Sequence, residues 1–375
     1  MKGFFIYNSP IDQDKPTGVD KKVLAQIGAF QSSGLDCQMY LLEQSSGNSG
    51  MDGMLRALIR RLPFSNLDPK WQYDDSFDDI DFLYFRKPSY LTQPFRQMLV
   101  HLRRRNPKAK VVMEIPTYPY DQEYKAGLWE KPFIWKDQYN RLRLWHLIDC
   151  IVIVSEKGLD SVFGIPAVRM INGIDINSFA VRHPVENTSI DLCAVAMFSK
   201  WHGYDRLLKG LINYYQEGGP RDIIIHFAGD GPELASYRHL ASHRLLENRV
   251  KFYGHVTGQD LETVYNIADF GVTSLGAYRV GINVGSFLKS RDYLAKGLPM
   301  ITGCPIDVLD SSFPYYFEFP NDDTPIDFKQ IVDMYDKIYS QNKPASAIAK
   351  SIRTYAEGKV DIRATMKPII EYLWA

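Results

Sequence analysis

Short apolar runs alternate with longer amphipathic stretches along most of the chain. In the first half, the apolar runs predict strands at 3–7, 35–42, 80–86, 111–115, 150–155 and 168–171. The amphipathic stretches between them predict helices at 19–31, 94–105 and 135–147. Because neighbouring parallel strands need a long crossover, which is usually a helix, this alternation predicts an α/β domain around a parallel sheet.

The same alternation starts again in the second half of the chain. Apolar runs predict strands at 192–197, 223–227, 250–253 and 299–302, with another that begins at Phe270. Beyond these strands, the pattern predicts helices at 325–341, 343–356 and 363–374. Between the halves, segment 180–189 is polar, contains Pro184 and lacks periodicity, as linkers do. We therefore predict two domains, at 1–180 and 189–356, followed by a helical segment at 357–375.

The stretch from 270 to 303 combines a strand, a glycine-rich loop, a helix and a second strand. Its loop region contains Gly276, Gly281 and Gly285 together with the two cations Arg279 and Lys289. The helix ends at the stop signal Gly297-Leu298-Pro299. Such a βαβ unit leaves backbone N–H groups unpaired at the positive end of a helix, which is how many proteins hold phosphate groups. An ordinary crossover with a permissive loop has the same pattern.

Composition narrows the classes of function. The 375 residues include 44 basic and 44 acidic side chains, so the formal net charge is zero and nothing global indicates a nucleic-acid partner. The four cysteines form no Cys-x-x-Cys pair, which favours a reducing cytosol over a zinc site or a disulfide framework. No apolar run approaches the roughly 20 residues of a membrane span, and Met1-Lys2 leads directly into a strand. These features predict a soluble, cytoplasmic protein.

A basic cluster at 103–110 closes the helix predicted at 94–105. Its sequence, RRRNPKAK, suits contact with anionic lipid at the inner face of a membrane. A solvated helix end, where cations meet the helix dipole favourably, has the same pattern. Peripheral membrane contact through 103–110 is therefore one of two open interpretations.

Segment 286–301, SFLKSRDYLAKGLPMI, resembles the signature helix of the retaining GT-B glycosyltransferases of the family 4 type. Members usually have a Glu, seven residues, a second Glu, then Ala, a small residue and Gly-x-Pro. Asp292 falls on the second acidic position and Val284 on the first. The sequences NGID at 172–175 and GDGP at 229–232 fit the same family in the same order. The resemblance implies two Rossmann-like domains whose parallel sheets face each other across a cleft, with a final helix that returns to the N-terminal domain.

The resemblance also implies where a nucleotide-sugar donor binds. Lys200 is the candidate phosphate cation with Arg206 as the alternative, and His202 stands where the family usually has a lysine; a loop histidine satisfied by the backbone is the other interpretation of His202. Asp292 would accept hydrogen bonds from the ribose. The candidate donor-binding residues are Gly18, Lys200, His202, His255, Val256, Arg279, Gly285, Ser286, Phe287, Leu288, Lys289 and Asp292.

The loop after the strand at 111–115 carries the candidate catalytic residues Glu114, Tyr118 and Asp121. In an open α/β sheet, ligands bind at the carboxyl ends of the strands, where this loop begins. Glu114 or Asp121 would activate or orient an acceptor hydroxyl. The alternative is that these residues cap helices and stiffen the loop. Family members commonly have a histidine near this point, and this sequence has none.

The predicted function is transfer of a sugar, with retention, from a nucleoside diphosphate donor, a UDP-sugar favoured, to a saccharide or lipid-linked saccharide. The resemblance implies bacterial polysaccharide or capsule assembly as its setting. No cofactor and no metal is expected beyond the donor, because the sequence has no Asp-x-Asp at a strand end. A GT-B nucleotide-sugar epimerase or hydrolase is one alternative. A catalytically silent sugar-nucleotide binding protein is the other, because Val284 replaces the first acidic residue.

Overall fold

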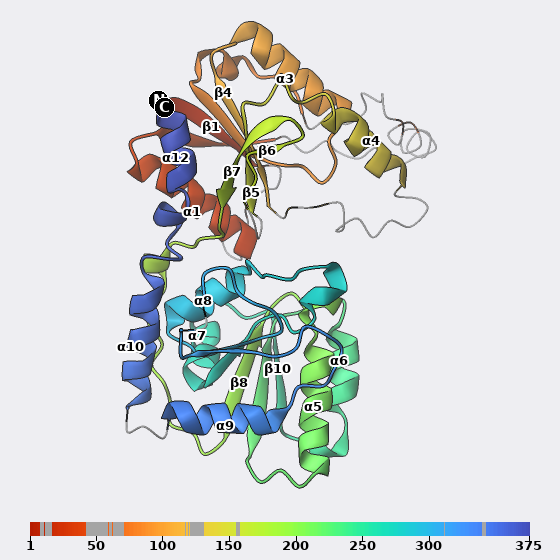
Figure 1. Ribbon diagram of the computed structural model, residues 1–375, viewed down its shortest axis with the longest axis vertical. Helices are drawn as coiled ribbons and strands as arrows, with labels where there is room; N and C mark the ends of the chain where they lie inside the picture. The colour runs from red at the N-terminus through yellow and green to blue at the C-terminus, as the bar shows by residue number, and fades with distance from the viewer. Residues whose placement is uncertain are drawn as a thin grey trace. The chain divides into compact units, whose positions relative to one another are not determined.

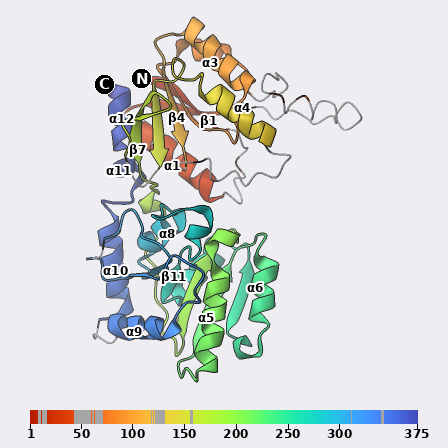
Figure 2. The ribbon, with the colours of Figure 1, turned by 45° about the vertical axis from the view of Figure 1, so that its right-hand side comes forward.

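The computed structural model describes residues 1–7, 11, 17–42, 59, 62, 71–116, 118, 120, 131–154, 158–310, 312–339 and 343–375. These residues form two compact units (Figure 1). Unit 1 comprises Met1–Ile171 together with Thr365–Ala375, and unit 2 comprises Asn172–Ala364. In each unit, helices cover both faces of a sheet (Figure 2).

The sheet of unit 1 has the strand order β2-β1-β3-β4-β5-β7-β6. Its strands are β1 (Lys2–Tyr7), β2 (Asp36–Leu41), β3 (Phe82–Arg86), β4 (Lys110–Ile115), β5 (Cys150–Val154), β6 (Ser161–Val162) and β7 (Ile165–Met170). All neighbouring pairs are parallel except β6 and β7, which form an antiparallel pair at the sheet edge. Its helices are α1 (Gly18–Ser32), α3 (Gln93–Arg105), α4 (Lys131–Arg141) and α12 (Lys367–Trp374).

The core of unit 1 lies on both faces of its central strands. Nearly every residue of β3, β4 and β5 is buried, which explains why these strands are continuous apolar runs rather than alternating ones. On one face, α3 contributes Phe95, Met98, Leu99 and Leu102, which are spaced at one side of a helix and are all buried. The spacing of apolar residues in the sequence predicted helix α3, because the residues that face the core recur at the helical period.

The sheet of unit 2 is entirely parallel, with the order β10-β9-β8-β11-β12-β13. Its strands are β8 (Ile190–Val195), β9 (Ile223–Ala228), β10 (Val250–Gly254), β11 (Phe270–Val272), β12 (Met300–Thr302) and β13 (Tyr316–Glu318). Its helices are α5 (Tyr204–Gln216), α6 (Leu234–Ala241), α7 (Gly258–Ile267), α8 (Leu288–Lys296), α9 (Phe328–Tyr339) and α10 (Ala345–Ala356). The chain runs outward from β8 in one direction and returns to continue from β11 in the other, so the order reverses between β8 and β11.

The C-terminal helix α12 belongs to unit 1, after the short helix α11 (Ile362–Thr365). It packs against β7, and the Lys110 ammonium donates to the carbonyl oxygens of Tyr372 and Leu373, both at 3.0 Å. A cation at the last carbonyls of a helix is favourable because those carbonyls lack partners inside the helix. The predicted fold class, two α/β domains with parallel sheets and a returning final helix, is confirmed.

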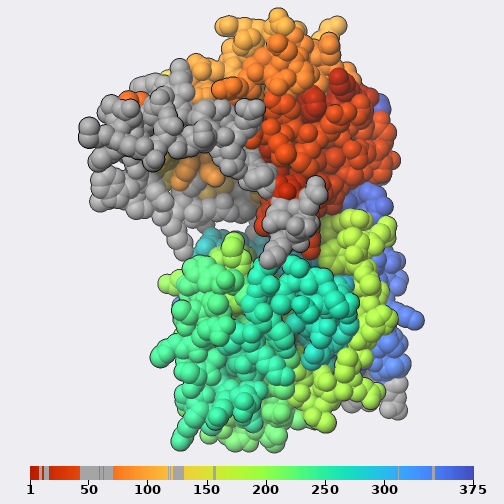
Figure 3. All heavy atoms as spheres, turned by 180° about the vertical axis from the view of Figure 1, so that it is seen from behind, coloured from red at the N-terminus to blue at the C-terminus, as the bar shows by residue number. Residues whose placement is uncertain are grey.

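The boundary between the units lies at 171/172, ahead of the linker predicted at 180–189. That segment is fixed within unit 2: Arg182 is buried and donates to the Ala268 carbonyl at 2.5 Å, and the Val185 N–H donates to the Asn266 carbonyl at 3.0 Å. Arg353 of α10 donates to the carbonyls of Ile176 and Phe179, both at 2.8 Å, so the yellow-green segment adjoins the blue helix (Figure 3). A polar composition here reflects hydrogen bonding rather than a flexible connection.

Two short strands were missed from the sequence, and one helix was placed a few residues too late. Strands β6 and β13 have two and three residues, which is too short for a periodic pattern, and both lie at sheet edges. Helix α4 begins at Lys131 and ends at Arg141, which is earlier at both ends than the helix predicted at 135–147. Isolated helix boundaries are weakly specified where no cap residue marks them.

Candidate functional site

The candidate site lies in unit 2 at the carboxyl ends of β8 and β11. The loop after β8 contains the short helix η4 (Lys200–His202), and the loop after β11 contains η6 (Ala277–Val280). These two strands flank the point where the strand order reverses, which is the usual ligand position in an open parallel sheet. The loops after β8 and β11 lie at the same edge because all strands of a parallel sheet end on the same side.

The two loops touch through their backbones at Gly203 and Gly276. Gly203 has a φ of +66°, and a Cβ atom added to it would lie 2.4 Å from the Gly276 nitrogen. The Leu275 N–H also donates to the His202 carbonyl at 2.8 Å. Glycine is therefore required at 203 both for the left-handed backbone and for this close approach.

The N-terminus of α8 faces this edge without a cap. Its N-cap residue, Phe287, makes no side-chain capping hydrogen bond. Across the part of the chain that the structure describes, the N–H groups of Phe287, Leu288 and Lys289 have no acceptor. By contrast, Thr17 and Asp20 form a complete capping box at the start of α1. An uncapped helix start with three unpaired N–H groups favours an anion.

Lys289 extends from this helix start into an aromatic wall. Its Nζ lies 3.3 Å from the Tyr204 hydroxyl, and 5.4 Å and 5.6 Å from the ring centres of Trp201 and Tyr204. No carboxylate among the described residues lies within ion-pair distance of this ammonium. Burial among the rings lowers the pKa of Lys289 well below its ordinary value, and the charge of Asp292 opposes that shift. Lys289 is thus a cation held in place without an anion.

His202 is buried beside Lys289 and has a fixed tautomer. Its Nδ1 accepts from the Ser199 N–H at 2.9 Å, so the proton of the neutral ring belongs on Nε2. Burial, and secondly the charge of Lys289, lower the pKa of His202 to about 2. His202 is therefore a neutral hydrogen-bond donor through Nε2. The backbone satisfies Nδ1, as one interpretation of the sequence expected, and the contact of His202 with a donor stays a prediction.

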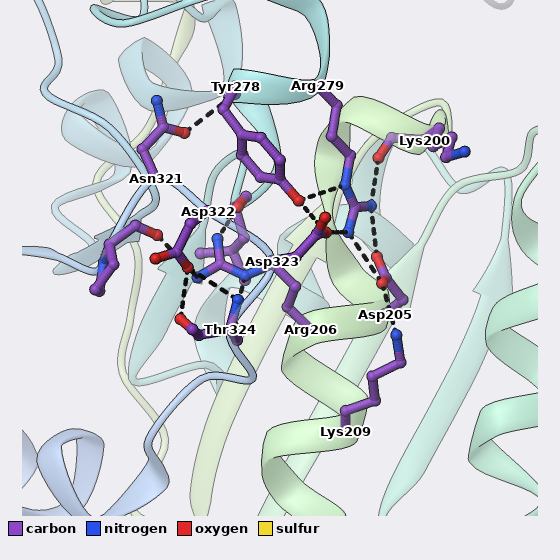
Figure 4. Close-up of polar contacts among 12 residues, drawn as sticks. Lys200, Asp205, Arg206, Lys209, Tyr278, Arg279, Asn321, Asp322, Asp323 and Thr324 are labelled. Carbon is purple, nitrogen blue, oxygen red and sulfur yellow. Dashed lines mark hydrogen bonds and ion pairs between the residues drawn. The ribbon is translucent and has the colours of Figure 1, made fainter.

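The two arginines near the site brace its loops (Figure 4). Arg206 is fully buried and donates to the carbonyls of Thr324 at 2.7 Å, Pro320 at 2.8 Å and Leu275. Arg279 pairs with Asp205 at 2.7 Å and Asp323 at 2.6 Å, and donates to the Lys200 carbonyl at 2.9 Å. Both guanidinium groups are thus occupied by carbonyl or carboxylate partners within the fold. The side chain of Lys200, by contrast, is exposed. This occupancy argues against the donor role expected for Arg279 and for Arg206.

Two other predicted donor contacts anchor the loop itself. The Gly285 N–H donates to the Pro305 carbonyl at 2.7 Å, so it is already paired. The Ser286 hydroxyl accepts from the Asn172 N–H at 3.3 Å and from Arg291 at 3.2 Å. Within the described residues, the N–H groups of 286–289 have no acceptor, so in the set 285–289 it is the N–H of Gly285 that is already paired.

The remaining candidates in unit 2 lie near the same edge. His255 is exposed and Val256 half-buried, directly after Gly254 at the end of β10, and Gly254 has a φ of +68°. Asp292 is half-buried on α8, one turn beyond Leu288. Val284, at the position of the missing acidic residue, is also half-buried. Their contacts with a nucleotide stay predictions.

Glu114 is a buried anion of unit 1 rather than a residue of an open loop. Its side chain has no exposed surface, and it accepts from Lys22, Gln26 and Tyr84, each at 2.7 Å. Burial pushes its pKa up, but the charges of Lys22 and Arg86 and the hydrogen bonds outweigh burial and lower the pKa of Glu114 to about 2. The structure thus gives Glu114 a stabilising role, and an acceptor hydroxyl would have no access to it.

The partners of Glu114 were missed in the sequence. Lys22 and Gln26 are four residues apart on the inner face of α1, together with the buried Val23 and Ile27. Polar residues on an otherwise buried helical face were the available signal, because such groups need a partner in the core. That partner is the carboxylate of Glu114, which lies on strand β4 of the sheet beneath the helix.

The structure describes two of the three other candidate residues of unit 1, Tyr118 and Gly18. Tyr118 is half-buried, its N–H donates to the Val154 carbonyl at 3.1 Å, and its ring contacts that of Phe163. Gly18 is exposed and is the first residue of α1. Asp121 lies outside the described residues. Within those residues, no group of three or more His, Cys, Asp or Glu side chains is arranged to hold a metal ion.

A family model described as "Glycosyl transferases group 1" matches residues 175–282, less than a third of the chain. The match spans β8 to η6, so it includes Lys200, His202 and Arg279 but ends before α8. No match is found among curated proteins.

Solved structures resemble the whole chain. A glycosyltransferase from Rickettsia africae has a TM-score of 0.62 at 13% identity, with 99% of this chain and 97% of that chain covered. HepE from Anabaena, in complex with UDP, has a TM-score of 0.59 at 14% identity, with 100% of both chains covered. Sucrose-phosphate synthase from Thermosynechococcus elongatus has a TM-score of 0.61 at 13% identity, with 100% and 99% covered. The chain therefore has the fold of the GT-B glycosyltransferases, and its segment 175–282 is similar to glycosyl transferases of group 1.

Proposed function

We propose that the protein is a glycosyltransferase that moves a sugar from a nucleoside diphosphate donor to a saccharide or lipid-linked saccharide acceptor. The observation that carries this proposal is the uncapped start of α8, where Lys289 has no anionic partner among the residues that the structure describes. A diphosphate supplies the missing charge and the missing acceptors together. The family match and the fold support sugar transfer as the chemistry.

The residues around α8 suit the chemistry of the leaving group. As the bond to the sugar breaks, negative charge grows on the departing diphosphate, and preorganised donors that meet this charge lower the barrier. The N–H groups of 287–289, the Lys289 ammonium and the Nε2–H of His202 would supply such donors. Asp292 would hold the ribose, which needs a hydrogen-bond acceptor. In this proposal these cations and dipoles serve where other transferases use a metal.

A UDP-sugar is the favoured donor, with retention at the anomeric carbon and a hexose as the transferred group. The support is that HepE, which shares this fold, is known in complex with UDP and with UDP-glucose. We also propose polysaccharide or capsule assembly as the setting, from the resemblance of the sequence to the family 4 type.

The first test is calorimetric titration with UDP, GDP and dTDP. We expect one of them to bind, and we expect Lys289→Met to weaken that binding about 10- to 100-fold, the scale of a charge-assisted contact. Lys337→Met, an exposed lysine on α9, is the matched control and should leave the dissociation constant unchanged. Failure of all three nucleotides to bind would sink the proposed function.

A catalytically silent sugar-nucleotide binding protein is the second candidate. Val284 at the first acidic position and the inaccessible carboxylate of Glu114 favour it. Incubation with UDP-, GDP- and dTDP-sugars separates the two, because a transferase slowly hydrolyses its donor without an acceptor. Binding of the nucleotide with no turnover of any donor sugar would favour the silent protein. An epimerase would instead change the configuration of the sugar, and its product would still be a nucleotide sugar.

We propose that a membrane surface contacts unit 1 at the end of α4 and the turn after it, rather than through the basic cluster at 103–110. Within 103–110, Arg103 pairs with Asp149, Arg105 with Asp78, and Lys110 with the end of α12. The largest exposed apolar side chains nearby are instead Trp135 on α4, and Leu142 and Trp145 just after it, with 62%, 70% and 66% of their surface exposed. Arg103 also donates to the Leu147 carbonyl at 3.2 Å, so the basic end of α3 adjoins this turn. Tryptophan beside cations is typical of a lipid interface.

Replacing both Leu142 and Trp145 by serine should reduce binding to vesicles that contain phosphatidylglycerol by about tenfold, because the apolar contacts are lost. Trp374→Ser, an exposed tryptophan on α12, is the control. Vesicle flotation measures the bound fraction. Equal flotation of the double variant and the unmodified protein would contradict this contact. No helix in the described part of the chain has both the length and the apolar character to span a bilayer.

A further inference from the structure

We infer that unit 1 has a phosphate-binding site of its own, in which Arg86 at the end of β3 binds a phosphate group of a substrate. The inference deepens the proposed function, and it rests on that function for the two sources of phosphate. One source is the diphosphate of the donor, and the other is the phosphate that a lipid-linked saccharide carries. Arg86 thus adds a cation of unit 1 to the donor candidates of unit 2.

Arg86 stands where the strand order of unit 1 reverses. From β1 the chain continues to β2 on one side and then to β3 on the other, which gives the order β2-β1-β3-β4. In open α/β sheets, ligands bind at the carboxyl ends of the two strands that flank such a reversal. Arg86 is the last residue of β3 and is paired in register with Glu114 of β4. Its position is therefore one where a ligand of unit 1 is expected.

The guanidinium of Arg86 is largely buried and makes no hydrogen bond to the residues that the structure describes. The side chain is 16% exposed, and its Nη1 is buried without a partner. Its one ion pair within those residues is with Glu114, where 3.8 Å separates Nε from Oε1, too far for a hydrogen bond. A buried N–H group without an acceptor is unfavourable, because it has lost water and gained nothing in return.

The buried arginines of unit 2 provide a contrast. Arg182, Arg206 and Arg291 each donate to at least three oxygen atoms of the fold. Such arginines stabilise loops and need no further partner. Arg86 buries most of its side chain as well, yet it donates to none of the described residues. This difference indicates that the acceptor of Arg86 comes from a ligand.

The two carboxylates at this edge of the sheet are already occupied. Glu114 accepts from three other side chains, each at 2.7 Å. Asp20 accepts from the hydroxyl of Tyr7, the last residue of β1, at 2.7 Å and from the Thr17 N–H at 2.8 Å. A phosphate group offers several charged oxygen atoms, and the guanidinium fork can bind two of them in parallel. Arg86 therefore suits a phosphate better than a neutral sugar hydroxyl.

The decisive experiment measures the affinity of the whole chain for UDP, glucose 1-phosphate and inorganic phosphate by calorimetry. Arg86→Met removes the guanidinium and keeps an unbranched side chain, and we expect it to weaken binding of at least one of these probes about 10- to 100-fold. Arg104→Met, which removes an exposed arginine of α3, is the matched control and should leave all three affinities unchanged. Methyl glucoside, which has no phosphate, should not distinguish Arg86→Met from the unmodified protein.

The probes also distinguish the two sources of phosphate. Loss of affinity for UDP would assign Arg86 to the diphosphate of the donor. Loss for glucose 1-phosphate with unchanged affinity for UDP would assign it to the phosphate of an acceptor. Inorganic phosphate reports on the site itself, whichever substrate occupies it.

Unfolding by urea separates a binding role from a structural one. Arg86→Met removes no hydrogen bond between described residues and leaves Glu114 with its three partners, so we expect the unfolding midpoint without ligand to stay the same. Arg182→Met, by contrast, removes three hydrogen bonds and should lower the midpoint.

The outcomes separate this inference from the proposed function. Unchanged affinity of Arg86→Met for all three probes would overturn the inference, and a lower unfolding midpoint would then make Arg86 a structural partner of Glu114. The proposed function would still stand if UDP bound. If UDP, GDP and dTDP all fail to bind while inorganic phosphate binds in a manner that depends on Arg86, the phosphate site stands and the proposed function falls.

Discussion

Replacing Glu114 by glutamine is expected to lower the free energy of unfolding by about 3–5 kcal/mol, the range for breaking a buried ion pair. Glutamine keeps the shape of the side chain, but it removes the carboxylate charge that the buried ammonium of Lys22 contacts at 2.7 Å. Chemical denaturation, followed by the fluorescence of the tryptophans, measures the change. The same measurement on Glu357→Gln, which removes an exposed pair with Arg353, should give a loss of less than about 1 kcal/mol.

A double variant isolates the charge as the cause. Glu114→Gln combined with Lys22→Met removes both charges, so we expect it to recover a large part of the lost stability. If the double variant is less stable than Glu114→Gln alone, the effect comes from packing or from Gln26 and Tyr84 rather than from the ion pair. A Glu114→Gln variant as stable as the unmodified protein would contradict the buried network altogether.

Acid unfolding provides an independent check on Glu114. Its pKa is about 2 in the folded protein against an ordinary 4.5, so the contribution of Glu114 is present above about pH 4.5 and disappears as pH falls toward 2. That difference corresponds to about 3 kcal/mol, in line with the ion-pair range. The stability of Glu114→Gln should accordingly fall less steeply across this pH interval.

Gly203→Ala is expected to weaken nucleotide binding by at least about tenfold, since it disturbs both loops of the site at once. A methyl group at 203 would meet the Gly276 nitrogen at 2.4 Å, so the loops after β8 and β11 must separate. The left-handed backbone adds about 1–2 kcal/mol of strain. Titration with UDP, or with whichever nucleoside diphosphate binds, measures the loss.

Gly218 offers a matched control for Gly203. It also has a positive φ, of +79°, but an added Cβ would meet nothing within 4 Å. Gly218→Ala therefore carries the backbone strain without the clash, and it should lose stability while keeping the nucleotide affinity. Equal loss of affinity in both variants would mean that strain alone is responsible, and the contact between the loops would lose its assigned role.

The architecture was predictable because burial leaves a periodic trace in the sequence. The continuous apolar runs of β3, β4 and β5 and the spaced apolar face of α3 both follow from the layers they build. The edge strand β13 was not predictable on this basis, since its three half-exposed or exposed residues have no pattern to show.

The site was predictable only where one segment builds it. Lys289 and the unpaired N–H groups of α8 come from a single strand–loop–helix stretch, and the sequence indicated them as a unit. The burial of Glu114 was not predictable, because its partners Lys22 and Gln26 lie 92 and 88 residues away. The ion pairs of Arg279 were not predictable for the same reason, since its carboxylate partner Asp205 lies 74 residues away. Local patterns show which groups are charged, while the fold decides which charges are already neutralised.

The brace formed by Asp205, Arg279 and Asp323 limits how this chain can diverge. Arg279 and Asp205 are largely buried and neutralise each other, so a substitution at one leaves an unmatched charge at the other, whereas Asp323 is 75% exposed. Related proteins that keep these loops should therefore change positions 205 and 279 together or not at all, while position 323 is free to vary. Lys289, whose counter-charge is proposed to arrive with the ligand, is under no such constraint from the rest of the chain. Joint variation at 205 and 279 would thus indicate a rebuilt pair of loops, and variation at 289 would indicate a change of ligand.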